Sequence, residues 1–412
     1  MRSILTIFLL GFCVKAAFLA CTEPAGRDSW ELGRIAEFIS QGKGFISPFG
    51  SEREDRACIH FAPAVPAYLG ALQVATGSRA GSQAAAAWIN VLLSALTGVL
   101  LLTFGTRLFD KRTGLTAGII YSLCPASCYY VASSWSCTIL AFTGIVWLIL
   151  ATRLRERPSL WGVAGFGAAT GVMALIDTPF LLVAPVAVLA AMIPTKRIGW
   201  VVGGSVLSLL MFLVVASPWM YRCWQVTDGH LIPVRGNFGM ELWIGNHPGA
   251  ELPTQNRTYH PSTDPIEEAI YEPMGELEYN RHCLERAKEW ISSNPEKFYG
   301  LIPVRMAKYW LGESIVSPDE IPVKRVLKVF LQGIPLVFAL LGIGLAIRDR
   351  RPVLLLVACL VLVPLPHYVT HSGWTRYRLP LDPVIYLLAA HAISAFFKSK
   401  MGSDVEPSSD FD

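Results

Sequence analysis

The strongest constraint on this chain is a series of long apolar blocks that recur from its start almost to its end. Each block is roughly 18 to 24 residues long, close to the ~20 residues that a helix needs to cross ~30 Å of hydrocarbon. Only 16% of the 412 residues are charged and 53% are hydrophobic, whereas soluble domains carry about 25% charged residues. These features exclude a soluble enzyme and predict an all-α polytopic membrane protein.

Ten of these blocks are candidate transmembrane helices. They cover residues 4–20, 84–104, 115–131, 135–151, 160–176, 179–193, 198–216, 329–347, 353–369 and 379–396. Basic residues gather in alternate connections, for example at Arg107, Arg153 and Lys196. Because such residues mark the cytoplasmic side, we expect a multi-pass protein of the plasma (inner) membrane with both termini in the cytoplasm. Nothing in this pattern indicates binding to nucleic acid.

This topology divides the chain into four parts. They are an N-terminal transmembrane module (1–218) with a first external loop (21–83), an extracytoplasmic domain (219–327), C-terminal transmembrane helices (328–397) and a disordered cytoplasmic tail (398–412). The segment 219–327 holds 11 Lys and Arg against 15 Asp and Glu, in contrast to the basic inner connections. We therefore expect it to form a small external domain.

Acidic residues at the outer ends of the spans are candidates for chemistry, because a charge in or near lipid is costly and usually serves a function. In the first external loop, Asp28 and Glu31 lie three residues apart, on one face of an expected helix. A carboxylate there suits removal of a proton from an acceptor hydroxyl, or binding of a cation. The alternative is a solvated helix with internal ion pairs. Asp177, between two spans, is either a turn residue or a pocket carboxylate.

Arginines form two further clusters at the outer face. Arg222 and Arg235 lie at the start of the expected external domain, and Arg376 and Arg378 precede the last span. A guanidinium group offers a planar fork of donors that fits a phosphate. The alternative is that such residues anchor the helices at the membrane interface. The arginines are therefore candidate phosphate ligands.

Metal binding is suggested only weakly by the sequence. His367 and His371 have the i, i+4 spacing that suits a metal on a helix, although polar residues that cap a span are the commoner arrangement. The sequence identifies no cofactor with certainty, and a divalent cation is its one candidate. It contains no P-loop, GxSxG or HExxH motif. The residues alone leave a lipid-linked transferase and a transporter open.

Several stretches resemble the bacterial membrane glycosyltransferases of the GT-C superfamily, which includes family 39, the protein O-mannosyltransferases and the aminoarabinose transferases of lipid A. The similar segments are residues 28–36, 42–45, 63–66, 218–222, 232–239, 242–246, 276–279, 294–295, 305–310 and 376–383. They occur in the family's order from the first loop to the last span, and this order is more specific than any single segment.

The resemblance implies a GT-C-like fold with about ten spans and a reaction on the extracytoplasmic face. A sugar would move from a polyprenyl-phosphate donor to a hydroxyl of a glycan, glycolipid or protein acceptor, in contact with membrane lipids. The resemblance implies Asp28 as the base, with inversion at the anomeric carbon, and Glu31 or Asp177 as a second carboxylate. The implied phosphate ligands are Arg222, Arg235, Arg376 and Arg378.

The chain also departs from the family pattern. Relatives often carry an acidic residue in a Ser-Glu-Thr context, where this chain has Ser136, Cys137 and Thr138. Where relatives often have Leu-Thr-Arg-Pro, this chain replaces a cation with the anion of Asp177. Asp177 is a candidate to supply the lost carboxylate. The alternative function is a lipid-linked glycan transporter or a non-catalytic envelope assembly protein.

Overall fold

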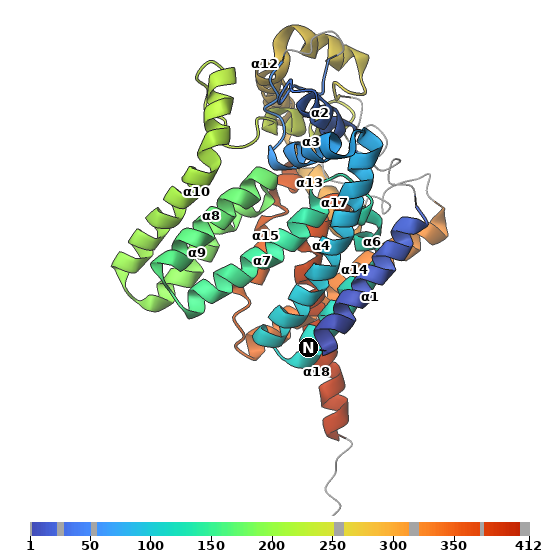
Figure 1. The fold of residues 1–412 in the computed structure, drawn as a ribbon, viewed down its shortest axis with the longest axis vertical. Helices are drawn as coiled ribbons and strands as arrows, with labels where there is room; N and C mark the ends of the chain where they lie inside the picture. The colour runs from blue at the N-terminus through green and yellow to red at the C-terminus, as the bar shows by residue number, and fades with distance from the viewer. Residues whose placement is uncertain are drawn as a thin grey trace, which may run out of the picture.

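The computed structural model describes residues 2–22, 29–50, 56–250, 259–312, 321–370 and 375–403. This part of the chain is helical, without a named strand (Figure 1). The elements are α1 (Arg2–Ala20), α2 (Trp30–Ser40), α3 (Ala64–Thr76), α4 (Arg79–Leu108), α5 (Lys111–Leu123), α6 (Pro125–Val131), α7 (Cys137–Glu156), α8 (Leu160–Ile176), η2 (Pro179–Leu182), α9 (Ala184–Met192), η3 (Ile193–Thr195), α10 (Ile198–Val226), α11 (Phe238–Gly245), α12 (Pro265–Ser293), α13 (Pro295–Leu311), α14 (Pro322–Arg348), α15 (Leu354–Leu362), α16 (Leu365–Val369), α17 (Thr375–Arg378), η5 (Leu379–Leu381) and α18 (Asp382–Ser403).

The expectation of a polytopic helical membrane protein is confirmed. Within the described residues, six helical segments are long and apolar enough to cross a membrane. They are Arg2–Ala20, Arg79–Leu108, Cys137–Glu156, Ile198–Val226, Pro322–Arg348 and Thr375–Lys398. Each overlaps one of the ten predicted spans. The predicted span 160–176 is the shorter apolar helix α8.

The other three predicted spans are interrupted helices, so the prediction of one continuous helix for each was wrong. The span 115–131 breaks at Cys124, whose backbone is extended just before Pro125 opens α6. The span 179–193 begins as the 3₁₀ helix η2, and the span 353–369 divides into α15 and α16 at Pro364. Pro125 explains the first break, because proline disfavours a helical conformation in the preceding residue. Thr178 and Val363, which precede Pro179 and Pro364, keep helical backbone angles, so at these two positions proline contributes through its missing N–H group.

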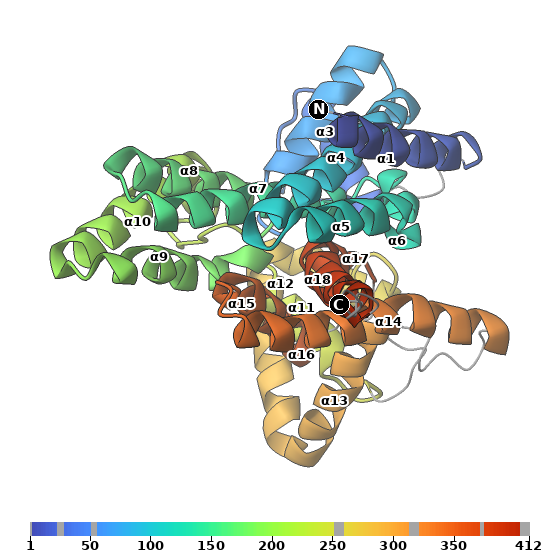
Figure 2. The ribbon, with the colours of Figure 1, turned by 90° about the horizontal axis from the view of Figure 1, so that it is seen from below.

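The transmembrane helices form two groups. In Figure 2, α8, α9 and α10 lie together on one side of α7, and α4 and α5 lie on its other side. Gly167 allows α8 to approach α10 closely, because a Cβ atom at this position would collide with the backbone of Ser208. The helix α7 thus connects the two groups, and its ends reach both surfaces of the bundle.

The external domain is built from two distant parts of the chain. Leu32 and Ile35 of α2 share one apolar core with Trp243 of α11 and Tyr279 of α12, at the top of the molecule in Figure 1. Gly275 interrupts α12 with a positive φ of 73°, a conformation that costs glycine least. The helix α10 continues to Val226, past the predicted domain boundary at 218.

Arg305 of α13 joins the external domain to the transmembrane helices. Its side chain is buried, with 6% exposure. It donates hydrogen bonds to the carbonyls of Gly245, at the end of α11, and Val369, at the end of α16, and to the side chain of Asn246. Because buried cations need such acceptors, Arg305 holds these three chain segments together.

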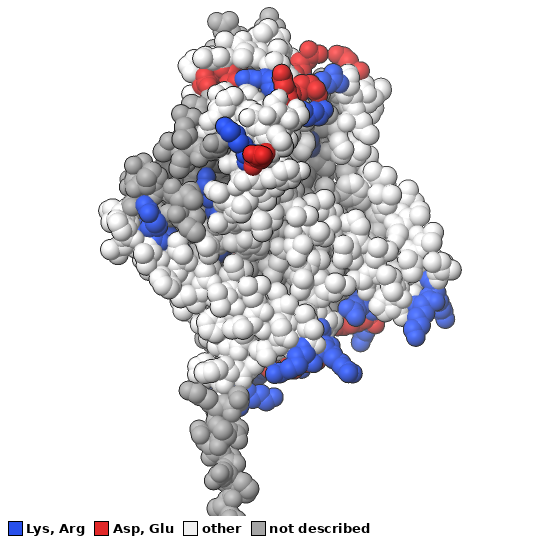
Figure 3. All heavy atoms as spheres, turned by 180° about the vertical axis from the view of Figure 1, so that it is seen from behind, with Lys and Arg blue, Asp and Glu red and all other residues white. Residues whose placement is uncertain are grey.

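The opposite end of the bundle is basic. Figure 3 shows lysines and arginines gathered at the lower end of the molecule, below a broad surface without charges. The helix α18 extends into the predicted tail as far as Ser403, and residues 404–412 lie outside the described residues. The separation of charged ends by an uncharged belt is the arrangement expected for a membrane-spanning bundle.

Candidate active site

A cavity of about 660 Å³ lies between the external domain and the ends of the transmembrane helices. This is within the range of ligand pockets, roughly 300–1,000 Å³. The elements that line it come from across the chain: the start of α2, the loop before α3, the connection from α6 to α7, the end of α8, the helix α11, the loop before α12, and α17. The cavity therefore forms only when the external domain is packed against the transmembrane helices.

Two arginines form a basic wall of the cavity. Arg235 pairs with Asp177 at 2.7 Å between Nη1 and Oδ1, and its Nε donates to the carbonyl of His60 at 3.3 Å. The guanidinium carbon of Arg376 lies 3.7 Å from the centre of the Trp135 ring. This distance is typical of a cation–π contact. Both guanidinium groups are thus held in place where they line the cavity.

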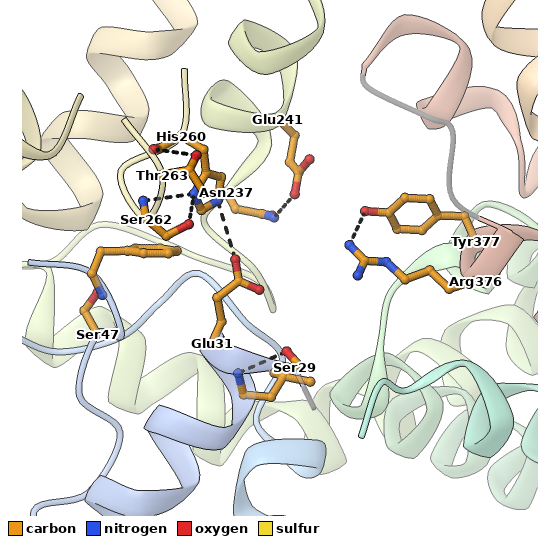
Figure 4. A network of polar contacts seen from close by, with 12 residues as sticks. Ser29, Glu31, Ser47, Asn237, Glu241, His260, Ser262, Thr263, Arg376 and Tyr377 are labelled. Atoms are coloured by element: carbon orange, nitrogen blue, oxygen red, sulfur yellow. Dashed lines mark hydrogen bonds and ion pairs between the residues drawn. The ribbon is translucent and has the colours of Figure 1, made fainter. Parts of the chain in front are cut away.

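Glu31 and His260 lie on the facing side of the cavity (Figure 4). Ser29 is the N-cap of α2 and accepts a hydrogen bond from the N–H of Leu32. Such a cap fixes the start of the helix. This brings Glu31 Oε1 within 3.5 Å of His260 Nε2. Asp28, the predicted base, directly precedes Ser29 in the sequence and lies outside the described residues.

The tautomer of His260 follows from its hydrogen bonds. Its Nδ1 accepts from the backbone N–H of Ser262 at 3.1 Å. A neutral imidazole that accepts at Nδ1 carries its proton on Nε2, the nitrogen that faces Glu31. Burial lowers the pKa of His260 to about 4. At neutral pH His260 is therefore an uncharged donor towards the Glu31 carboxylate.

This lowered pKa predicts a pH-dependent stability. Between the ordinary pKa of His, about 6.5, and the folded value of about 4, the unfolded chain binds the proton more readily, so stability falls as the pH falls through this window. In detergent, we expect the melting temperature to decrease from pH 7 to pH 5, and to decrease less in His260→Gln. His230→Gln, at an exposed position, is the matched control. An equal decrease of the melting temperature in wild type and His260→Gln would contradict the lowered pKa of His260.

Asp177 combines the two alternatives that its sequence context left open, because its Oδ1 accepts a hydrogen bond from the N–H of Thr178 at 2.8 Å, as in a turn, and the residue also lines the cavity. Its Oδ2 accepts a hydrogen bond from Ser136 Oγ at 3.0 Å. Ser136 belongs to the stretch in which the resemblance implied a carboxylate. Asp177 thus brings a carboxylate from the end of α8 to the start of α7.

Glu241 of α11 also lines the cavity, together with the two arginines. It accepts a hydrogen bond from Asn237 Nδ2 at 3.1 Å. Burial raises its pKa, although the charges of Arg235 and Arg376 oppose this shift. Neither Glu241 nor His260 was a predicted site residue. A carboxylate within the apolar segment 238–245 was a signal for Glu241, whereas nothing local distinguished His260.

The other predicted phosphate ligands have different surroundings. Arg222 donates to the carbonyls of Cys58 and Phe45, which fixes the first external loop against α10. Arg378 is 1% exposed and donates to Asp382 at 3.1 Å and to the carbonyl of Trp310. Neither arginine is among the residues that line the cavity. Of the four predicted phosphate ligands, the structure brings Arg235 and Arg376 together there.

The predicted metal ligand His367 lies between two tyrosine rings, with ring centres 5.5 Å from Tyr309 and 4.5 Å from Tyr377. Its predicted partner His371 lies outside the described residues. A site for two histidines at this position therefore stays a prediction.

Glu31 and His260 are the cavity residues best suited to a divalent cation, because carboxylate and imidazole groups are zinc ligands. Among the described residues, however, no group of three or more His, Cys, Asp or Glu side chains could hold a metal ion. The proton on His260 Nε2 also occupies the nitrogen that faces Glu31. The described part of the cavity thus shows no complete metal site, and a divalent cation stays a prediction.

Comparisons with solved structures identify the fold. The archaeal oligosaccharyltransferase AglB from Archaeoglobus fulgidus, in complex with an inhibitory peptide and a dolichol-phosphate, is similar over 99% of this chain and 52% of its own, with 13% identity and a TM-score of 0.54. The same organism's oligosaccharyltransferase in complex with zinc and sulfate gives 12% identity over 96% and 50% of the two chains, with a TM-score of 0.53.

ArnT from Cupriavidus metallidurans, bound to undecaprenyl phosphate, matches 98% of this chain and 80% of its own, with 14% identity and a TM-score of 0.42. No protein-family model and no curated protein matches the chain. The chain shares its fold with the archaeal oligosaccharyltransferase structures. It spans about half the length of the AglB structures.

Proposed function

We propose that this protein is a glycosyltransferase of the plasma membrane, which moves a sugar from a polyprenyl-phosphate donor to a hydroxyl group on the extracytoplasmic face. The observation that carries the proposal is one cavity lined by both arginines, Arg235 and Arg376, and by the carboxylate of Glu31. Figure 4 shows Glu31 and Arg376 on opposite sides of it. Phosphate departure requires cations on one side of the anomeric carbon, and acceptor activation requires a base on the other.

The mechanism follows from these two walls. The acceptor hydroxyl loses its proton to a carboxylate, for which Asp28 is the candidate, while its oxygen forms a bond to the anomeric carbon. The bond from that carbon to the donor phosphate breaks, and the phosphate leaves with the bonding electrons. Arg235 and Arg376 would stabilise the charge that develops on it. Attack from the side opposite the leaving group inverts the anomeric carbon.

The remaining polar groups have supporting roles in this proposal. His260 would orient the Glu31 carboxylate through its Nε2 proton, and Asp177 would hold Arg235 in the basic wall. The sugar can pack on the aromatic residues that line the cavity, which include Trp30, Tyr130 and Trp135. No step in this mechanism uses a metal. The acceptor would be a glycan, a glycolipid or a protein, and both termini would lie in the cytoplasm.

Mass spectrometry of lipid extracts and envelope glycans tests this proposal in cells with and without the protein. We expect one polyprenyl-phosphate sugar to accumulate in the cells that lack it, and the same sugar to disappear from a glycan. If the lipid-linked sugars and the envelope glycans were the same in both strains, with expression confirmed in the strain that carries the protein, the proposed transferase activity would be overturned. A non-catalytic membrane protein would then be favoured.

A substitution at Asp177 tests its supporting role. Asp177→Asn keeps an oxygen that can accept from Arg235 but removes the charge that pairs with it at 2.7 Å. We expect the KM for the donor to rise by about 10-fold with a smaller change in kcat, because charge-assisted hydrogen bonds contribute on the order of 1.5–3 kcal/mol and Arg235 keeps its bond to His60. Steady-state kinetics in vesicles measures both. A loss confined to kcat would instead make Asp177 a participant in proton transfer.

A further inference from the structure

A second cavity, of about 640 Å³, lies at the basic end of the bundle. It is formed by the end of α4, the end of α7 and the start of α8, and it shares no lining residue with the first cavity. The helix α7 lines the first cavity at Cys137 and the second at Leu154, and α8 does the same at Ile176 and Trp161. At 1.5 Å per residue, the 20 residues of α7 span about 30 Å, the thickness of the hydrocarbon layer. The two cavities therefore lie at opposite surfaces of the membrane.

Positive charge lines this second cavity. Its polar residues include Arg107, Arg153 and Arg157. Arg107 pairs with Glu156, which offsets one of the three charges. Within the described residues 56–250, which surround this cavity, neither Arg153 nor Arg157 forms a salt bridge. Two exposed guanidinium groups thus remain to bind an anion.

The other side of the cavity is apolar and open to lipid. Leu150, Leu154 and Phe166 line it, and Trp161 projects from the start of α8 with 89% exposure. Tryptophan at this depth is typical of the membrane interface. Gly165 adds space, because a Cβ atom there would meet nothing within 4 Å. The cavity therefore combines an anion-binding edge with a hydrocarbon-binding wall.

We infer that this cavity binds an anionic glycerophospholipid of the adjacent leaflet, with the phosphate at Arg153 and Arg157 and an acyl chain along Trp161 and Phe166. Basic pockets between transmembrane helices at the cytoplasmic side commonly bind acidic lipid headgroups. A small soluble anion would not need the apolar wall, and a neutral lipid would leave the two guanidinium groups without a counterion. The inference is independent of the proposed glycosyl transfer.

Native mass spectrometry and thermal unfolding of the purified full chain in detergent test the inference. The probes are phosphatidylglycerol, phosphatidylcholine and inorganic phosphate at matched concentrations. We expect one tightly retained phosphatidylglycerol and a raised melting temperature, with no comparable effect of phosphatidylcholine. If inorganic phosphate raised the melting temperature as much as phosphatidylglycerol does, the inference of a lipid site would be overturned in favour of a simple anion site.

Two variants remove the site in different ways. Arg153→Gln with Arg157→Gln removes the charges, and Gly165→Leu fills the cavity without changing the charge. Each should weaken phosphatidylglycerol retention by at least about 10-fold, the equivalent of roughly 1.4 kcal/mol. The matched controls are Lys196→Gln with Arg197→Gln, at the basic end but outside the cavity, and Gly203→Leu on α10, where a side chain also meets open space. Equal retention in variants and controls would show nonspecific attraction to the basic surface and overturn the inference.

Discussion

Sugar transfer by membranes that contain Asp28→Asn should fall by about 10²- to 10⁴-fold, the range attributed to general acid–base catalysis. Asparagine has nearly the size and shape of aspartate but cannot accept the proton of the acceptor hydroxyl. The loss should appear in kcat, with the KM for the donor little changed, because the donor phosphate is assigned to Arg235 and Arg376. Transfer from a labelled polyprenyl-phosphate sugar in vesicles measures both quantities.

Two further variants make this result specific to Asp28. Glu37→Gln removes a carboxylate from the same segment, at a partly exposed position where it lies 3.8 Å from Arg79, and should retain activity. Glu31→Gln tests a carboxylate that lines the cavity, and we expect a smaller loss than for Asp28→Asn. Full activity of Asp28→Asn at wild-type protein levels would exclude Asp28 as the base, and a larger loss in Glu31→Gln would transfer that role to Glu31.

Arg376→Gln should reduce kcat/KM by about 10²- to 10³-fold, as does removal of a single group that stabilises transition-state charge in other enzymes. Arg376 lies against the Trp135 ring and Arg235 is bonded to Asp177 and His60, so each guanidinium group is positioned before the donor arrives. Arg235→Gln should therefore have an effect of similar size. Steady-state kinetics with varied donor gives kcat and KM for each variant.

Conservative replacements distinguish charge from shape in the basic wall. Arg376→Lys keeps the charge but loses the planar fork and the ring stacking, so we expect it to recover only part of the activity. Arg79→Gln is the matched control, because Arg79 is a half-exposed arginine at the external end and does not line the cavity. Wild-type kinetics in Arg376→Gln would place the donor phosphate elsewhere and remove the main support for the proposed function.

Part of the candidate site follows from the position of residues next to a span, although the roles of these residues stay predictions. Arg235, Arg376 and Glu31 were all predicted in this way, and all three line the cavity. The same reasoning also selected Arg222 and Arg378, because an arginine that binds carbonyls or Asp382 looks the same in sequence as one that lines a cavity. His260 gave no signal, since its partner Glu31 belongs to a distant helix.

The sequence by itself determined the class of fold. Apolar blocks of membrane-spanning length require backbone hydrogen bonds within each segment, so they form helices, and alternating basic connections separate one end of the bundle from the other. Local signals also set helix boundaries, as with the caps at Ser29 and Ser159. These properties depend only on neighbouring residues.

Only the tertiary structure decided which charges meet. Asp177 and Arg235 are 58 positions apart and become partners because α8 ends beside the loop that precedes α11. The cavity likewise requires two parts of the external domain to share one core. Such contacts depend on how whole helices pack against one another, and the packing energy is spread over many residues. The hydrophobic periodicity of a single segment therefore does not predict which residues meet.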